Sequence, residues 1–134
     1  MFAIEPNDFA DAWVEGDETA RWRSTVGHGP SGGAESSGSS FLEIEPGRRL
    51  PWHTDSAEEA IAVLAGRARV TVGDESADVS TGGLTLVPAG AKHQVENAGG
   101  ETLRFIAFYA ATDVMTRYEH EVQPDGSSER RPVS

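Results

Sequence analysis

Four side chains in the middle of the chain have the types that hold metal ions. His53 and Asp55 are two residues apart, Glu59 follows shortly after them, and His93 lies further along the chain. Imidazole and carboxylate groups together suit a divalent ion of borderline or hard character. The chain contains no cysteine, which excludes thiolate ligands, disulfides and cysteine nucleophiles. A metal ion in this chain would therefore be bound by nitrogen and oxygen atoms.

These four residues fall in a part of the sequence that has the pattern of short β-strands. If residues 50–55 are extended, His53 and Asp55 lie on one face, because side chains alternate along a strand. The same alternation places Glu59 beside aliphatic residues, so that an inward-pointing Glu59 enters a cavity with apolar walls. His93 follows a Pro-Ala-Gly turn and could arrive from a neighbouring strand. On spacing alone, an ordinary polar role for the two histidines stays open.

The elements that position these residues indicate an all-β domain. Short runs rich in Val, Ile, Leu and Phe alternate with turns rich in Gly, Pro, Asp and Asn. The expected strands cover residues 20–28, 41–45, 50–55, 59–65, 67–72, 76–80, 84–87, 92–96 and 102–110, with a weaker one at 114–122. Gly73 and Asp74 separate two alternating runs and predict a tight hairpin turn. Strands of this number and spacing are typical of a sandwich or barrel, including jelly rolls.

The N-terminal region has a different pattern. Residues 7–15 are predicted to form a short helix, because Asn7 or Asp8 can cap it and because Phe9 and Trp13 are four residues apart on one face.

Two further stretches are polar. Residues 29–40 are rich in Gly and Ser and are interpreted as a mobile surface loop, with a lid over a site as the alternative. Residues 124–134 are polar, and we expect mobility at their end. The expected organisation is therefore an N-terminal part (1–40) packing on a barrel (41–123), followed by a polar tail (124–134).

Composition excludes several classes of partner. The chain has 134 residues, enough for one domain, and its formal net charge is −11 from 22 acidic and 11 basic residues. A nucleic-acid partner would need a basic face, and so would an anionic membrane surface. The N-terminus shows no basic start followed by an apolar run, and no apolar run approaches the length of a membrane span. We therefore expect a cytoplasmic protein.

Two stretches resemble the motifs of the cupin superfamily. Residues 47–66 read Gly47, five residues, His53, one residue, Asp55, three residues, Glu59, six residues and Gly66, which resembles the first cupin motif. Residues 82–97 read Gly82, five residues, Pro88-Ala89-Gly90, two residues, His93, three residues and Asn97, which resembles the second. The first motif usually has a second histidine where this chain has Asp55.

The resemblance implies a small RmlC-like jelly-roll barrel, the cupin double-stranded β-helix, with one divalent metal ion per chain inside it. By position, His53, Glu59 and His93 match the cupin metal ligands, and Asp55 matches a ligand position but not its usual residue type. The ion could be Fe, Mn, Zn, Ni or Cu. The resemblance also implies a homodimer, and an edge strand such as 20–28 could add to the partner's sheet.

The departure at Asp55 leaves three outcomes open. If Asp55 binds the ion, two carboxylates cancel its charge and the ion becomes a weaker Lewis acid. If Asp55 stays beyond the ion, two histidines and one carboxylate remain, an arrangement suited to non-haem Fe(II) and O₂ chemistry. Asp55 would then orient a bound water or act as a general base. In the third outcome the barrel is free of metal.

The function expected from these residues is that of a metal-dependent enzyme acting on a small organic molecule. Chemistry of the oxygenase type, such as a dioxygenase, and of the isomerase type are both open. Asp55 and Tyr109 are the candidate catalytic residues, although packing in the core is the more common role for such a tyrosine. The alternative is a cupin that binds metal or a small ligand without turnover. A metal-free epimerase would need a further His–carboxylate pair, which the sequence does not offer.

Overall fold

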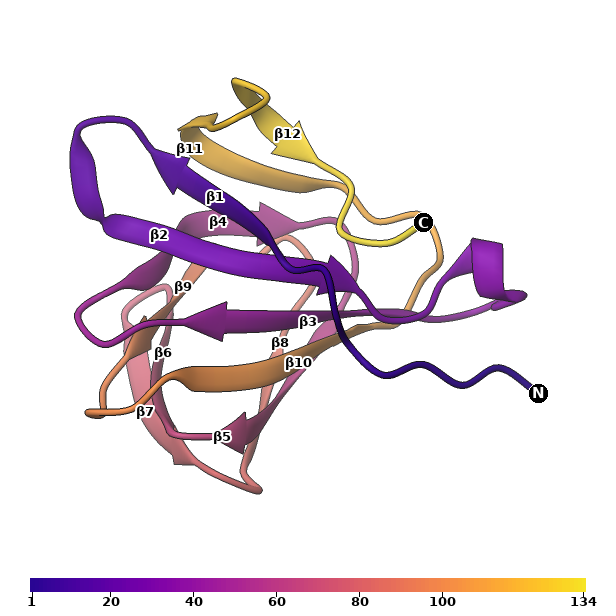
Figure 1. Ribbon diagram of the computed structural model, residues 1–134, viewed down its shortest axis with the longest axis horizontal. Helices are drawn as coiled ribbons and strands as arrows, with labels where there is room; N and C mark the ends of the chain where they lie inside the picture. Colours follow the sequence, from indigo (N-terminus) through magenta and orange to yellow (C-terminus); the bar gives the residue numbers. More distant parts are fainter.

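The computed structural model describes residues 1–134, and its regular secondary structure is almost entirely β-strand (Figure 1). The strands are β1 (Ala10–Val14), β2 (Asp17–Val26), β3 (Gly38–Ile44), β4 (Arg49–Asp55), β5 (Glu59–Ala65), β6 (Arg67–Val72), β7 (Glu75–Ser80), β8 (Leu84–Val87), β9 (His93–Asn97), β10 (Leu103–Tyr109), β11 (Thr116–Val122) and β12 (Ser127–Arg130). The helical content is a single 3₁₀ turn, η1 (Pro30–Gly32). No helix has the length and apolar character needed to cross a membrane. The all-β prediction is confirmed.

The strands form a jelly-roll barrel from two sheet halves. One half has the order β1-β2-β3-β10-β5-β8, and the other has the order β7-β6-β9-β4-β11-β12. The halves join where Ala20 of β2 pairs in parallel with Arg49 of β4. Because β5 belongs to one half while β4 and β9 belong to the other, inward side chains from these three strands meet inside the barrel.

Strand alternation fills this interior. Along β10, Leu103, Phe105, Ala107 and Tyr109 are buried, whereas Arg104 and Phe108 are exposed, so the first set lines the barrel. Along β5, Glu59 shares the buried face with Ile61 and Val63, as its spacing predicted. One polar residue is thus placed in an aliphatic wall.

Two turns shape this part of the barrel, and the first of them forms as the sequence indicated. Gly73 and Asp74 connect β6 to β7 as a two-residue hairpin, with Val72 opposite Glu75 and Gly73 at a φ of 60°. Asn97 closes the turn after β9, because its Oδ1 accepts a hydrogen bond from the backbone N–H of Gly99.

The helix predicted over residues 7–15 is wrong. Residues 10–14 form β1, which pairs antiparallel with β2 and places Ala12 opposite Trp22. A spacing of four residues, which Phe9 and Trp13 have, puts two side chains on one face of a helix but also on one face of a strand. Gly16, at a φ of 83°, makes the tight turn back into β2. Pairing with a neighbouring strand therefore decides the conformation.

The expected edge strand is also not an edge. β2 is flanked by β1 on one side and β3 on the other, so it has no free edge for the addition of a partner's strand.

The end of the chain contributes to the barrel. The tail, residues 124–134, contains β12, which pairs with β11. Val133 is buried in the core, and the hydroxyl of Ser40 donates to the carbonyl of Pro132. The Gly/Ser-rich stretch 29–40 is not a loop throughout, because its last three residues, Gly38 to Ser40, belong to β3.

Candidate metal centre

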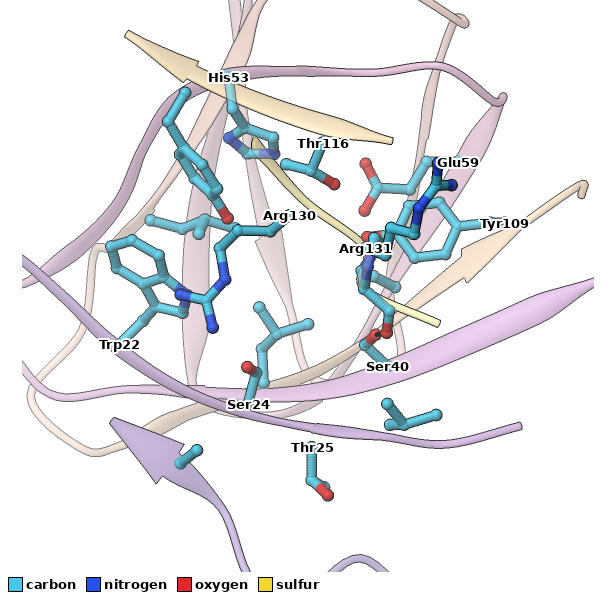
Figure 2. A pocket seen from close by; sticks show the side chains of 17 residues that line it. Trp22, Ser24, Thr25, Ser40, His53, Glu59, Tyr109, Thr116, Arg130 and Arg131 are labelled. Carbon is cyan, nitrogen blue, oxygen red and sulfur yellow. Dashed lines mark hydrogen bonds between the residues drawn. The ribbon is translucent and has the colours of Figure 1, made fainter. Parts of the chain in front are cut away.

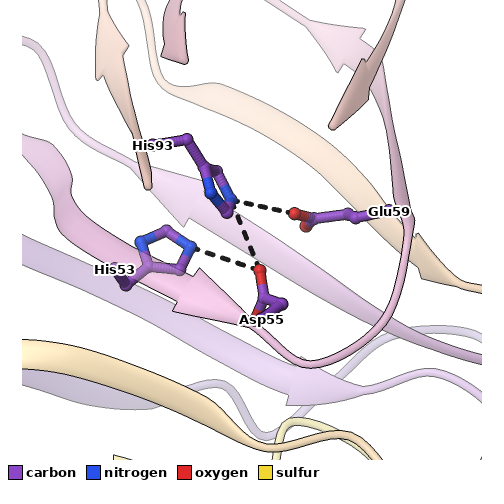
Figure 3. Close-up of side chains that lie close together, drawn as sticks. All are labelled: His53, Asp55, Glu59 and His93. Atoms are coloured by element: carbon purple, nitrogen blue, oxygen red, sulfur yellow. Dashed lines mark hydrogen bonds and ion pairs between the residues drawn. The ribbon is translucent and has the colours of Figure 1, made fainter. Parts of the chain in front are cut away.

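Four buried side chains converge inside the barrel (Figure 3). β4 and β9 are antiparallel neighbours, and His53 lies directly opposite His93 with the ring centroids 4.1 Å apart. Asp55 lies two residues further along the same face of β4. Glu59 is the first residue of β5 and approaches from the other sheet half. The structure therefore brings together all four residues that the sequence singled out.

A turn fixes the approach of His93. The Pro-Ala-Gly turn before β9 is tied to the end of β4, because the N–H of Gly90 donates to the carbonyl of Asp55 at 2.8 Å. Gly90 has a φ of 76°, which a residue with a Cβ adopts only at a cost. This link holds the first residue of β9 beside Asp55.

The separations between donor atoms suit a shared ion. His93 Nε2 is 3.0 Å from Glu59 Oε1 and 3.3 Å from Asp55 Oδ2, and His53 Nε2 is 3.6 Å from Asp55 Oδ2. Two atoms that each lie about 2.1 Å from one ion are about 3.0 Å apart at a right angle and about 3.4 Å apart at the tetrahedral angle. One ligand atom from each residue lies within 4.8 Å of the others. The four side chains could therefore hold one cation.

Hydrogen bonds around the cluster orient these atoms. His53 Nδ1 lies 2.6 Å from the carbonyl of Pro51, and His93 Nδ1 lies 2.8 Å from the carbonyl of Ala91. A ring whose Nδ1–H donates to a carbonyl presents the lone pair of Nε2, the usual support for a metal-binding histidine. Both Nε2 atoms point into the cluster.

The carboxylate of Asp55 has one supported and one free oxygen. The hydroxyl of Thr116, on β11, donates to Oδ1. Oδ2 is buried and has no hydrogen-bond partner. A buried charged oxygen without a partner is costly, and it faces the Nε2 atoms of both histidines. A cation at the centre of the cluster would satisfy it, so the donor set fits a divalent metal ion.

The pKa values of the cluster residues also indicate that the two buried carboxylates need a positive charge beside them. Burial, reinforced by the charge of His93, lowers the pKa of His53 to about 4. Burial raises the pKa of Glu59 to about 7. Burial opposes the charge on His93, but its contacts with Asp55 and Glu59 outweigh this and raise its pKa to about 10. Without a metal ion, a proton on His93 thus supplies the positive charge that two carboxylates require.

A cavity of about 210 Å³ adjoins the cluster (Figure 2). His53 and Glu59 belong to its lining, as does the buried Tyr109. Burial raises the pKa of Tyr109 well above its usual value, so its hydroxyl keeps the proton at neutral pH. Residues 29–37 do not line this cavity, which gives the lid interpretation of the Gly/Ser-rich stretch no support.

Several cavity residues were missed by the sequence reasoning. The ring of Tyr118 lies 5.2 Å from that of His53 and stacks on Trp22 at 5.4 Å. Thr116 and Tyr118 share one face of β11, and alternation in the weaker strand 114–122 was the signal that could have found them. Arg130, from the end of β12, also lines the cavity, and nothing in the polar tail marked it.

Comparison with protein families identifies the family of the segment that contains the cluster. The family model described as the cupin domain matches residues 40–109, which is more than half of the chain and contains all four residues of the cluster. This chain belongs to the cupin family. No curated protein matches this cupin.

Solved structures confirm the fold. The E162A mutant of Bacillus subtilis oxalate decarboxylase matches this cupin with 20% identity and a TM-score of 0.65, over 80% of this chain and 30% of that chain. The oxalate decarboxylase formate complex of Lactobacillus farciminis matches with 21% identity and a TM-score of 0.64, over 74% and 31% of the two chains. A conserved protein of unknown function from Streptococcus pyogenes matches with 17% identity and a TM-score of 0.57, over 71% and 77%. This cupin spans under a third of the length of these two decarboxylases.

Proposed function

We propose that this cupin binds one divalent metal ion through His53, Asp55, Glu59 and His93 and acts on a small organic molecule in the adjoining cavity. The observation that carries the proposal is Oδ2 of Asp55, which is buried, has no hydrogen-bond partner and lies within 3.6 Å of the Nε2 atoms of His53 and His93. Two of the four donors, His53 and Glu59, line the adjoining cavity, which favours a metal ion close to a bound molecule.

The position of Asp55 supports its role as a ligand. Its second oxygen is held by Thr116, so that Oδ2 is directed at the histidines and not at the cavity. Asp55 itself is absent from the cavity lining, where a general base would have to reach a substrate. Of the three outcomes left open by the sequence, coordination by Asp55 is therefore the one that we favour.

The ion would supply Lewis-acid or redox chemistry, as in an isomerase or an oxygenase. The residues of this chain would supply binding and exclusion of water. Tyr109 retains its proton and can donate a hydrogen bond to an oxygen of the bound molecule. Leu42, Leu50 and Trp22 give the cavity apolar walls. Identities near 20% to oxalate decarboxylases carry the fold to this cupin and leave its reaction open.

One observation favours the alternative of binding without turnover. If both carboxylates bind the ion, neither is free as a base, and the remaining acidic group beside them, Tyr109, keeps its proton at neutral pH. A cavity of this kind can hold a ligand without moving a proton.

Elemental analysis of protein purified without chelator or added metal tests the metal centre. We expect about one divalent ion per chain in the wild type and almost none in His53→Ala and Glu59→Ala. His120→Ala removes an exposed histidine outside the cluster and should retain the ion. Equal metal content in wild type and both cluster variants would refute the assignment.

Activity then separates the enzyme from the binding module. Oxygen uptake is measured with the loaded protein and a panel of small enols, phenols and thiols, and isomerisation is followed as exchange of carbon-bound protons in D₂O. Uptake or exchange that is lost in Glu59→Ala identifies the class of enzyme. A loaded protein that binds members of the panel but shows neither reaction is the expected result of the alternative.

A further inference from the structure

Arg130 differs from every other arginine of the chain. Each of the others forms an ion pair with a carboxylate or donates a hydrogen bond to a backbone carbonyl: Arg21, Arg23, Arg48, Arg49, Arg67, Arg69, Arg104, Arg117 and Arg131. Nη1 of Arg130 is buried from solvent and has no hydrogen-bond partner. A buried donor without a partner is rare in a folded protein and calls for an explanation, such as a ligand that completes the site.

The surroundings of Arg130 are those of a binding site. Its side chain lines the cavity that adjoins the metal centre, as does Trp22 (Figure 2). The chain carries 22 acidic residues, and yet no ion pair reaches this arginine. Of the carboxylates, the lining contains only Glu59, which belongs to the metal cluster. A positive charge in a cavity of an acidic protein attracts a small anion.

The shape and lining of the cavity narrow the class of anion. A guanidinium presents its N–H groups as a planar fork that matches the two oxygens of a carboxylate. Trp22, Leu42, Leu50 and Val26 offer apolar surface beside it. A volume of about 210 Å³ is below the range of pockets for drug-sized ligands, about 300 to 1,000 Å³, and so limits the ligand to a short chain or a single ring.

We propose that Arg130 is the anion-binding residue of this cavity, and that the ligand is a small organic carboxylate with an apolar or aromatic body. The carboxylate binds the guanidinium of Arg130, and the body lies between the aromatic and aliphatic walls, directed towards His53 and Glu59. This inference deepens the proposed function by naming the class of molecule brought to the metal centre. Its account of why the molecule binds there rests on the proposed function, whereas binding at Arg130 itself does not.

Binding of benzoate to the full chain tests the proposal, with benzamide as a neutral molecule of the same shape. Affinity is measured by calorimetry and by tryptophan fluorescence, in metal-loaded protein and after removal of metal with a chelator. We expect benzoate to bind in both forms at least about tenfold more tightly than benzamide, since a hydrogen bond to a charged group contributes about 1.5 to 3 kcal/mol.

Arg130→Gln should bring benzoate down to the affinity of benzamide, and Arg130→Lys should restore part of the difference. Arg117→Gln is the matched control, because Arg117 is an exposed arginine on the neighbouring strand β11 that pairs with Glu129 and does not line the cavity. It should change the affinity less than about twofold. Circular dichroism and the metal content of Arg130→Gln are measured alongside, and both should equal those of the wild type.

The possible failures are distinct. Equal benzoate affinity in wild type and Arg130→Gln overturns the role of Arg130, and equal affinity for benzoate and benzamide overturns the selection of an anion. Benzoate that binds only when metal is present and ignores Arg130→Gln would be a ligand of the ion, which contradicts this inference and supports the metal centre. If inorganic phosphate binds as tightly as benzoate, the claim that the ligand has an apolar body is wrong. Metal-free protein that binds benzoate through Arg130 upholds the inference even if the metal centre fails.

Discussion

The metal cluster and the wall of the adjoining cavity are built from different parts of the chain. The cluster comes from β4, β5 and β9, all within the stretch that matches the cupin family, residues 40–109. Much of the wall comes from outside that stretch: Trp22 is on β2, Thr116 and Tyr118 are on β11, and Arg130 is on β12. Under the proposed function this is a division of labour: residues 40–109 would hold the ion, and the ends of the chain would select the molecule that reaches it.

The largest effect is expected at the cluster. His93 contacts both Asp55 and Glu59, so His93→Ala removes one ligand and also leaves two buried carboxylates without their neighbour. We expect metal affinity to fall by more than about 100-fold, beyond the 10- to 100-fold loss typical of a supporting residue. Competition with a chelator of known affinity measures it, and His120→Ala serves as the control. Loss of less than tenfold would mean that His93 is not a ligand.

A smaller effect is expected where the two regions meet. Thr116 belongs to the cavity wall, but its hydroxyl holds the oxygen of Asp55 that faces away from the histidines. Thr116→Val keeps the volume and removes the hydroxyl, and we expect metal affinity about tenfold weaker. Thr116→Ser should restore it. If Thr116→Val binds metal as well as the wild type does, the wall and the cluster are independent, and Asp55 is oriented by its backbone alone.

Metal binding at the cluster and carboxylate binding at Arg130 should also differ in their dependence on pH. In the metal-free protein, contacts with Asp55 and Glu59, acting against burial, hold the pKa of His93 at about 10, and the ion must displace that proton. Metal affinity should therefore rise about tenfold per pH unit from pH 7 to about 9, and more steeply below pH 7, where burial has raised the pKa of Glu59 to about 7. His53, whose pKa is lowered to about 4, adds nothing in this range.

Chelator competition at several pH values measures this slope. In the loaded protein, carboxylate binding at Arg130 should stay constant between pH 7 and 9, because a guanidinium keeps its charge there. A metal affinity that is flat from pH 7 to 9 would show that no proton is displaced, contrary to the arrangement described for His93.

The sequence predicts the cluster better than the wall, and the reason is physical. His53, Asp55 and Glu59 are close along the chain, and strand alternation with a short connection is enough to orient them. Arg130 reaches the cavity because β12 pairs with β11, a long-range contact for which a polar tail gives no local signal. The same limit explains the N-terminal error, since the spacing of Phe9 and Trp13 fits both a helix and a strand, and only pairing with β2 distinguishes them.

The smallest effect on both regions is expected from the outer surface, where we place self-association. The homodimer stays a prediction. Because β2 has no free edge, we now expect the contact on a different surface from the strand 20–28. The outer face of β5, β8 and β10 exposes Leu64, Leu84, Leu86 and Phe108. In a chain of net charge −11, two copies repel each other over most of their surface, and this apolar face offers contact without that repulsion.

Sedimentation should show a dimer at micromolar concentration for the wild type and a monomer for Leu86→Glu, with unchanged metal content. A wild-type monomer would exclude self-association, whereas metal loss in Leu86→Glu would show that the cluster depends on the interface and that the division of labour is incomplete.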